Sequence, residues 1–250
     1  MNKNETHTSG IEKVIEGMKV KTRHSSKSEI KVKALLLDLD GVVIKNAFKV
    51  DEAKRGLIEK LEKLGVDVST ISANDTFMDI MAKAEKQAVE RKKLDLKYLR
   101  KSMSAVLDKF DFDAFSESEL TGGARSVINE LRRRGLKLGL VTNSGRARVK
   151  VALEKFGLSG CFDVIVTRND VERIKPSGEC VEKAVSTLGY APNEVAYVGD
   201  SWTDVVAAKN AGVTAIAIVD GVSPKEKVLQ ASPDVIISSL EELLRITPEK

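Results

Sequence analysis

The fold is decided by residues 34–41, which read Ala34-Leu35-Leu36-Leu37-Asp38-Leu39-Asp40-Gly41. The four apolar residues predict a buried strand, and two carboxylates follow it closely. Residues two apart on a strand face the same way, and a glycine allows a sharp turn beyond the sheet edge. Because open α/β sheets bind ligands at the carboxyl ends of their strands, this pattern predicts a catalytic or metal-binding site. A strand that ends in a polar turn is the simpler interpretation of these residues alone.

The composition is typical of a soluble globular protein. The chain has 250 residues, of which 31% are charged, and this length allows one large domain or a core domain with a smaller addition. No stretch approaches the ~20 apolar residues of a membrane helix, and the N-terminus lacks an apolar signal-peptide core. We therefore expect no membrane partner and a cytoplasmic location. Cys161 and Cys180 are too few for a disulfide framework, and we expect both to be small buried side chains.

The net charge of +4 resides at the N-terminus. Residues 1–33 contain eight Lys or Arg residues against four Glu, so the charges of residues 34–250 balance to zero. We expect no nucleic-acid partner, because phosphate-backbone binding needs a concentrated basic face. Both histidines, His7 and His24, lie in the same segment. The rest of the chain therefore has no Ser-His triad, histidine-bound zinc or histidine base, which leaves Asp, Glu, Lys and hydroxyl groups for chemistry.

Hydrophobic periodicity predicts an arm followed by alternating strands and helices. Residues 1–32 are polar and basic, and we expect them to form a partly disordered arm. From residue 33 onward, short β-rich runs alternate with helical stretches, which predicts a parallel sheet with crossover helices. The predicted strands lie at residues 33–39, 136–142, 163–167, 195–198, 214–219 and 235–237. The predicted helices lie at residues 123–134, 146–156, 178–188, 203–211 and 240–246.

One interval is too long for a crossover, because about a hundred residues separate the first predicted strand from the second. The intervening residues show helical apolar stripes, such as that of Leu57 and Leu61, which we interpret as packing faces. We therefore predict a helical cap at residues 46–118. It is inserted into a catalytic core formed by residues 33–45 and 119–250.

Three later segments carry polar groups after predicted strands: Thr142-Asn143, Lys175-Pro176, and Gly199-Asp200 followed by Asp204. The hydroxyl and amide of the first segment bind phosphate oxygen well, but they are equally common in ordinary turns. A lysine before a proline is held extended, so it can project from its loop. The acids of the third segment repeat the arrangement of Asp38 and Asp40 after another buried strand.

In this order and context, the four segments resemble the motifs of the haloacid dehalogenase superfamily, in which they lie at the ends of four strands of one sheet. The resemblance covers residues 34 to about 246. The helical insertion is similar to the cap of the phosphoglycolate phosphatase-like branch. The resemblance implies an α/β fold, with a Rossmann-like parallel sheet and an inserted all-helical cap. It also implies Mg²⁺-dependent hydrolysis of a phosphoglycolate-like compound or a sugar phosphate through an aspartyl phosphate.

The resemblance also assigns roles to individual residues. Asp38 is the expected nucleophile, and Asp40 is the expected acid that protonates the leaving group and then activates water. Lys175 is the third expected catalytic group and neutralises phosphoryl charge. The expected substrate-binding residues are Gly41, Thr142, Asn143 and Lys175. The expected metal ligands are Asp38, the backbone carbonyl of Asp40, Asp200 and Asp204, and the sequence leaves open whether Asp204 binds directly or supports its neighbours.

Two other functions are compatible with the sequence. A sugar-phosphate mutase of the same superfamily has the same pair of acids and the same aspartyl phosphate. A non-enzymatic interaction protein could use this scaffold, with the basic arm contacting an acidic partner, but every expected catalytic position is occupied here. A dehalogenase has no need of the acid that Asp40 supplies. The expected partner is a small phosphorylated metabolite, and the sequence indicates no oligomeric state.

Overall fold

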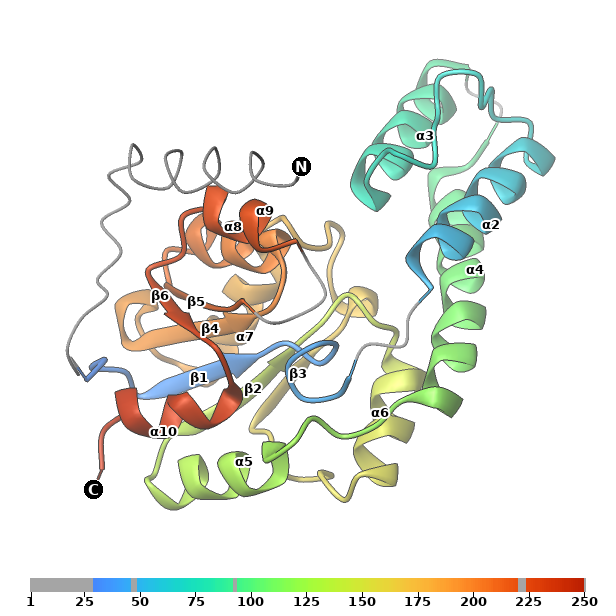
Figure 1. The fold of residues 1–250 in the computed structure, drawn as a ribbon. Helices are drawn as coiled ribbons and strands as arrows, with labels where there is room; N and C mark the ends of the chain where they lie inside the picture. Colours follow the sequence, from blue (N-terminus) through green and yellow to red (C-terminus); the bar gives the residue numbers. More distant parts are fainter. Residues whose placement is uncertain (1–28, 46–48, 92–93, 220–223, 250) are drawn as a thin grey trace, which may run out of the picture.

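A computed structural model of the protein describes residues 29–45, 49–91, 94–219 and 224–249. The described residues form one six-stranded parallel sheet with helices on both faces (Figure 1). The strands are β1 (Ala34–Leu37), β2 (Lys137–Val141), β3 (Val164–Val166), β4 (Val195–Gly199), β5 (Thr214–Ile218) and β6 (Val235–Ile237), in the order β3-β2-β1-β4-β5-β6. Each of these strands lies within or overlaps a predicted one, and the α/β class is confirmed. Most of the predicted arm, residues 1–28, lies outside the described residues.

Alternation along β1 places apolar side chains on both faces of the sheet. Leu35 and Leu37 point to one face and Ala34 and Leu36 to the other, and all of them are fully buried. The first face packs against α5 (Ala124–Arg133), α6 (Arg146–Lys155) and α10 (Leu243–Ile246). The second packs against α7 (Glu179–Leu188), α8 (Trp202–Asn210) and α9 (Lys225–Gln230). A continuous apolar run is what a strand covered on both sides requires.

The smaller elements and the cysteines complete this core. Short 3₁₀ turns lie at η1 (Arg168–Asp170), η2 (Pro192–Glu194) and η3 (Leu240–Glu242). The sequence pattern does not predict α9, because this six-residue helix has a single buried residue, Val228, and too few turns to show a period. Both cysteines are buried and free, as predicted. Burial raises the pKa of Cys180 to about 11, so this thiol is neutral and unreactive near pH 7.

A helical insertion fills the interval between β1 and β2, as predicted. Its helices in the described residues are α2 (Val50–Lys63), α3 (Phe77–Arg91) and α4 (Leu96–Glu117). They share an apolar cluster of their own, which includes Leu57, Leu61, Ile80, Leu99 and Met103. The predicted stripe of Leu57 and Leu61 is therefore a packing face. Figure 1 shows α4 running from the far end of the insertion back to the sheet, where it contacts α6.

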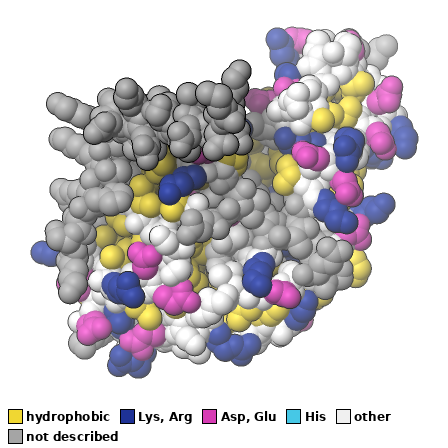
Figure 2. Space-filling view, viewed as in Figure 1, with side chains coloured by type: hydrophobic (Ala, Val, Ile, Leu, Met, Phe, Trp, Pro, Cys, Tyr) yellow, Lys and Arg dark blue, Asp and Glu magenta, His cyan; other side chains and the backbone are white. Residues whose placement is uncertain are grey.

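The surface carries a mixture of charges. On the face in Figure 2, Lys and Arg side chains are interspersed with Asp and Glu over both the insertion and the sheet-bearing part. This agrees with the balanced charge of residues 34–250. Within the described ranges, no helix combines the length and the apolar composition that crossing a membrane requires.

The centre of the sheet should not tolerate a side chain at Gly139 of β2. A Cβ placed there would lie 2.4 Å from Leu36 Cδ2 and 2.8 Å from Val164 Cγ1. We expect Gly139→Ala to lower the free energy of unfolding by about 1–3 kcal/mol, the usual cost of overpacking a filled core. Gly122 is the matched control, because a Cβ there meets no atom within 4 Å. Gly122→Ala should leave stability unchanged or raise it slightly. Urea unfolding measures both variants, and equal stabilities would contradict this packing.

Candidate active site

Four strand ends meet at one edge of the sheet. Because β1 lies between β2 and β4, and β3 lies beside β2, the loops that follow these strands are neighbours. Asp38 follows β1, Thr142 follows β2 and Asp200 follows β4, while Lys175 comes from the longer loop after β3. The registers of β1 with β2 and with β4 keep these ends level. The sheet order therefore brings the four predicted segments to one place.

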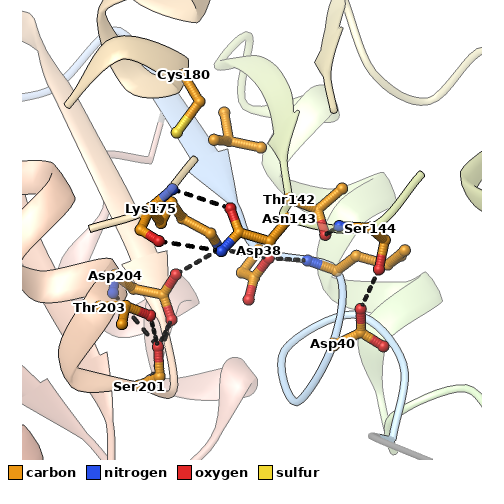
Figure 3. Close-up of polar contacts among 12 residues, drawn as sticks. Asp38, Asp40, Thr142, Asn143, Ser144, Lys175, Cys180, Ser201, Thr203 and Asp204 are labelled. Carbon is orange, nitrogen blue, oxygen red and sulfur yellow. Dashed lines mark hydrogen bonds and ion pairs between the residues drawn. The ribbon is translucent and has the colours of Figure 1, made fainter. Parts of the chain in front are cut away.

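Lys175 is the buried cation at the centre of this place. Its Nζ lies 2.9 Å from Asp38 Oδ1, 2.6 Å from Asp204 Oδ1 and 2.8 Å from the hydroxyl of Tyr197. Figure 3 shows the ammonium group between the two carboxylates. Burial alone would lower the pKa of Lys175, but the carboxylates of Asp204 and Asp38 outweigh burial and raise the pKa above its ordinary value. Lys175 therefore stays protonated at neutral and mildly alkaline pH.

Three buried carboxylates lie close enough to share one cation. One oxygen from each of Asp38, Asp200 and Asp204 lies within 4.8 Å of the others. Burial raises the pKa of Asp38 well above its usual value; Lys175 opposes this effect, while the neighbouring carboxylates add to it. Buried carboxylates at this spacing repel one another, so a bound cation would stabilise the cluster. Closely spaced carboxylate oxygens are ligands for a hard divalent cation, so the residues fit the Mg²⁺ that the sequence resemblance implies.

Asp204 has both carboxylate oxygens engaged by other protein groups. Its Oδ1 accepts hydrogen bonds from Lys175 and from the Tyr197 hydroxyl, at 2.6 and 2.9 Å. Its Oδ2 accepts from the amide and the hydroxyl of Ser201, at 3.1 and 2.5 Å. Ser201 is the N-cap of α8, and the reciprocal bonds form a capping box that fixes Asp204 in the first turn. This bonding favours a role in orienting Lys175 over direct metal binding.

Asp40 has a separate set of partners from Asp38. Its Oδ2 accepts hydrogen bonds from the Ser144 hydroxyl at 2.7 Å and from Arg148 Nη1 at 2.6 Å, and Arg148 Nη2 donates to Oδ1. Because β1 ends one residue before Asp38, the strand alternation no longer aligns the two side chains. Figure 3 shows Asp40 directed toward Ser144, and Asp38 beside Lys175. The strand pattern predicts two carboxylates that point together, and the structure gives them different directions.

Thr142 and Asn143 make turn and loop contacts. Thr142 Oγ1 accepts a hydrogen bond from the Ser144 amide at 3.0 Å. The Asn143 side chain donates to the carbonyl of Lys175 at 3.2 Å and accepts from its amide at 3.0 Å. Asn143 thus holds the loop that presents Lys175. Substrate binding by Gly41, Thr142 and Asn143 stays a prediction.

Two buried polar residues lie at the site without a role predicted from the sequence. Tyr197 of β4 is 1% exposed, and its hydroxyl lies 3.0 Å from the Val141 carbonyl in addition to its contacts with Lys175 and Asp204. Arg148 lies on the buried face of α6. A hydroxyl inside an apolar strand and an arginine on the apolar face of a helix both need buried polar partners, and this is the signal that points to them.

A family model described as haloacid dehalogenase-like hydrolase matches residues 32–212. Among curated proteins, the chain is similar to the pyrophosphatase PpaX of Halalkalibacterium halodurans, with 37% identity over 128 residues. These residues are 51% of this chain and 60% of that protein. The match therefore spans less than two thirds of the length of this relative.

Solved structures share the fold. A predicted phosphoglycolate phosphatase from Haemophilus somnus gives a TM-score of 0.59 at 21% identity, covering 87% of this chain and 99% of the other. A hydrolase from Pseudomonas syringae gives a TM-score of 0.63 at 18% identity, covering 85% and 96%. At these identities the likeness establishes the fold alone, which is the α/β sheet with its helical insertion.

Gly41 should be required for the position of the Asp200 carboxylate. Its φ is +82°, and a Cβ there would lie 2.0 Å from Asp200 Oδ2. We expect Gly41→Ala to displace this carboxylate and to weaken binding of a divalent cation about tenfold or more, measured by isothermal titration calorimetry with Mg²⁺. Gly65→Ala is the matched control, because Gly65 has a φ of +78° and a Cβ there meets no atom within 4 Å. Gly65→Ala therefore introduces the backbone strain of a positive φ without a steric clash. Equal Mg²⁺ affinities in the two variants would contradict the placement of Gly41.

Proposed function

Because the chain belongs to the haloacid dehalogenase-like hydrolase family, we propose that it is a Mg²⁺-dependent phosphatase that hydrolyses a small phosphomonoester through an aspartyl phosphate on Asp38. The observation that carries this proposal is the buried Lys175 between Asp38 and Asp204, with Asp200 in the same carboxylate cluster. Phosphoryl transfer needs a positioned nucleophile surrounded by fixed positive charge, and this arrangement supplies both once a cation is bound.

The same carboxylates would hold the metal. Asp38 and Asp200, with the backbone carbonyl of Asp40, are the proposed ligands, and Asp204 is proposed to orient Lys175. When bound, Mg²⁺ neutralises phosphoryl charge and keeps Asp38 ionised, which offsets the effect of burial on the pKa of that carboxyl group.

The proposed reaction proceeds through two displacements at phosphorus, in which Asp38 and Asp40 take part. In the first, an Asp38 oxygen forms a bond to phosphorus, the bond from phosphorus to the leaving oxygen breaks, and Asp40 gives that oxygen a proton. In the second, Asp40 takes a proton from water, the water oxygen bonds to phosphorus, and the Asp38–phosphorus bond breaks. Lys175 stays protonated and stabilises phosphoryl charge in both steps.

We propose phosphoglycolate-like compounds or sugar phosphates as the substrate class and the cytoplasm as the location. The proposed cap is residues 46–118, over a core of residues 33–45 and 119–250, and the separate apolar cluster of the insertion supports this division. The similarity to a pyrophosphatase supports a small phosphorylated substrate. A screen of phosphorylated metabolites that includes pyrophosphate, read by phosphate release, tests the proposal. Product analysis distinguishes hydrolysis from the phosphoryl transfer of a mutase.

Removal of divalent cations should abolish turnover of any substrate found in that screen. Mg²⁺ should restore turnover, whereas Ca²⁺ should not, because Ca²⁺ prefers longer bonds and higher coordination than a compact carboxylate site offers. Phosphate release after dialysis against a chelator and addition of each cation measures this. Full activity in a metal-free sample would contradict the metal assignment.

Substitutions of the two acids should give different defects. Asp38→Asn removes the nucleophile in a nearly isosteric change, so kcat should fall by about 10⁴-fold or more and no phosphoenzyme should form. Asp40→Asn should slow alkyl phosphate hydrolysis about 10²–10⁴-fold, but an aryl phosphate needs little protonation and should still phosphorylate Asp38. Intact-protein mass spectrometry of quenched samples should show one added phosphoryl group in Asp40→Asn and none in Asp38→Asn.

Circular dichroism of the two variants serves as the control for folding. Phosphate on a folded Asp38→Asn variant, or normal aryl phosphate turnover by Asp40→Asn, would contradict the assigned roles.

A further inference from the structure

A series of ion pairs connects Asp40 to the helical insertion. It runs from Asp40 through Arg148 of α6 to Asp111 of α4, and then through Arg168 to Asp108, which also lies on α4. We call these five residues the ion-pair network. The side chains of Arg148, Asp111 and Arg168 are only 1%, 3% and 5% exposed. Buried ion pairs are costly to desolvate, so a gain in stability is a weak explanation for them.

At one end of the ion-pair network, Arg148 contacts both oxygens of the Asp40 carboxylate. Its Nη1 donates to Oδ2 at 2.6 Å and its Nη2 donates to Oδ1, while Ser144 donates to Oδ2 at 2.7 Å. A bidentate ion pair between a guanidinium and a carboxylate fixes the plane of the carboxylate as well as its position. Asp40 lies beyond the end of β1, where the sheet ladder no longer directs its side chain. Arg148 therefore sets the direction of this acid.

On its other side, Arg148 faces the cap helix α4. Its Nη1 lies 3.8 Å from Asp111 Oδ1. Asp111 Oδ2 in turn contacts Arg168 Nη1 at 2.5 Å and accepts a hydrogen bond from the Gly145 amide at 2.9 Å. The position of Asp111 is thus held by Arg168 of η1 and by the Gly145 amide at the start of the helix that carries Arg148. One guanidinium group stands between a carboxylate of the core and a carboxylate of the insertion.

The Nε groups of Arg148 and Arg168 support this interpretation. Both are buried without a hydrogen-bond partner among the residues that the structure describes. Buried donors are normally paired, so the two guanidinium groups are not placed to satisfy all their own hydrogen bonds. Their orientation follows the carboxylates at their Nη ends.

From this geometry, and resting on the proposed function, we propose that Arg148 is a positioning residue that aims the ionised Asp40 carboxylate as the base for water in the second displacement, and that Asp111 makes this aim depend on the placement of α4. A displacement of α4 moves Asp111 relative to Arg148 and so changes the environment of the group that holds Asp40. Arg148 is not a substrate ligand, because its Nη groups already donate to Asp40 and Ser144 and its side chain is buried.

Replacement of Arg148 should affect proton transfer selectively. Arg148→Met should slow dephosphorylation of Asp38 about 30-fold or more, while phosphorylation of Asp38 by an aryl phosphate in a single turnover changes less than about threefold. Phosphoenzyme should then accumulate with the aryl phosphate, as measured by intact-protein mass spectrometry of quenched samples. Arg148→Lys keeps the positive charge but not the bidentate contact, so its kcat should lie between those of the wild type and Arg148→Met. If Arg148→Met does not fold, Arg148→Lys carries the same test.

Asp111→Asn tests the dependence on α4, because it leaves Asp40 and Arg148 unchanged. We expect kcat for the alkyl phosphate to fall about 3–10-fold, and this loss should disappear in an Arg148→Met background, because both residues act through one contact. Arg134→Met is the matched control for a buried arginine. The Arg134 side chain is 6% exposed and donates to the carbonyls of Leu244 and Thr247. Its loss should lower the unfolding midpoint without changing the ratio of the dephosphorylation rate to the phosphorylation rate of Asp38.

The outcomes distinguish this inference from the proposed function. Equal losses in the phosphorylation and dephosphorylation rates of Arg148→Met, unchanged rates, or additive losses in the double variant would overturn the inference and leave the proposed function standing. A wild-type chain that hydrolyses no phosphomonoester would overturn the proposed function and the inference with it.

Discussion

The contact of the Lys175 ammonium group with Asp38 and Asp204 is the interaction on which the rest of the site depends. Three carboxylates whose oxygens lie within 4.8 Å of one another repel each other strongly inside a protein. Lys175 lies 2.9 Å from one and 2.6 Å from another, and Asn143 holds its backbone in place. The order of the strands makes this possible, because it places the loop after β3 within reach of the ends of β1 and β4. The mutual repulsion of these buried carboxylates is the physical reason to expect a bound cation.

Much of the fold and part of the site could be predicted from the sequence, because a parallel sheet brings strand ends together whatever the details of the loops. Asp38 and Asp200 directly follow buried apolar runs, and their neighbourhood follows from the strand order alone. The direction of Asp40 could not be predicted in this way. Its partner Arg148 lies 108 positions later in the chain, and neither local segment indicates the pairing. The small helix α9 leaves no periodic signal either, because one buried side chain does not define a face.

The helix α4 connects the insertion with the sheet-bearing part. Toward its N-terminal end, Leu99 and Met103 pack in the apolar cluster of the insertion. Toward its C-terminal end, Asp108 and Asp111 pair with Arg168, which follows β3, and Asp111 also lies near Arg148, which follows β2. Apolar packing and buried charge thus act on one helix of 22 residues. Helical periodicity predicts the first of these contacts, whereas the second depends on the tertiary placement of α4 against α6.

In the proposed reaction, Asp38 carries the phosphoryl group during turnover. Wild-type protein can be quenched while it hydrolyses an aryl phosphate in the presence of Mg²⁺ and then reduced with borohydride, which converts an aspartyl phosphate to homoserine. Peptide mass spectrometry locates the reduced residue. We predict homoserine at position 38, formed only with both substrate and Mg²⁺. Reduction at Asp40 or at any other acid, or unmodified Asp38 in a sample that turns over normally, would contradict it.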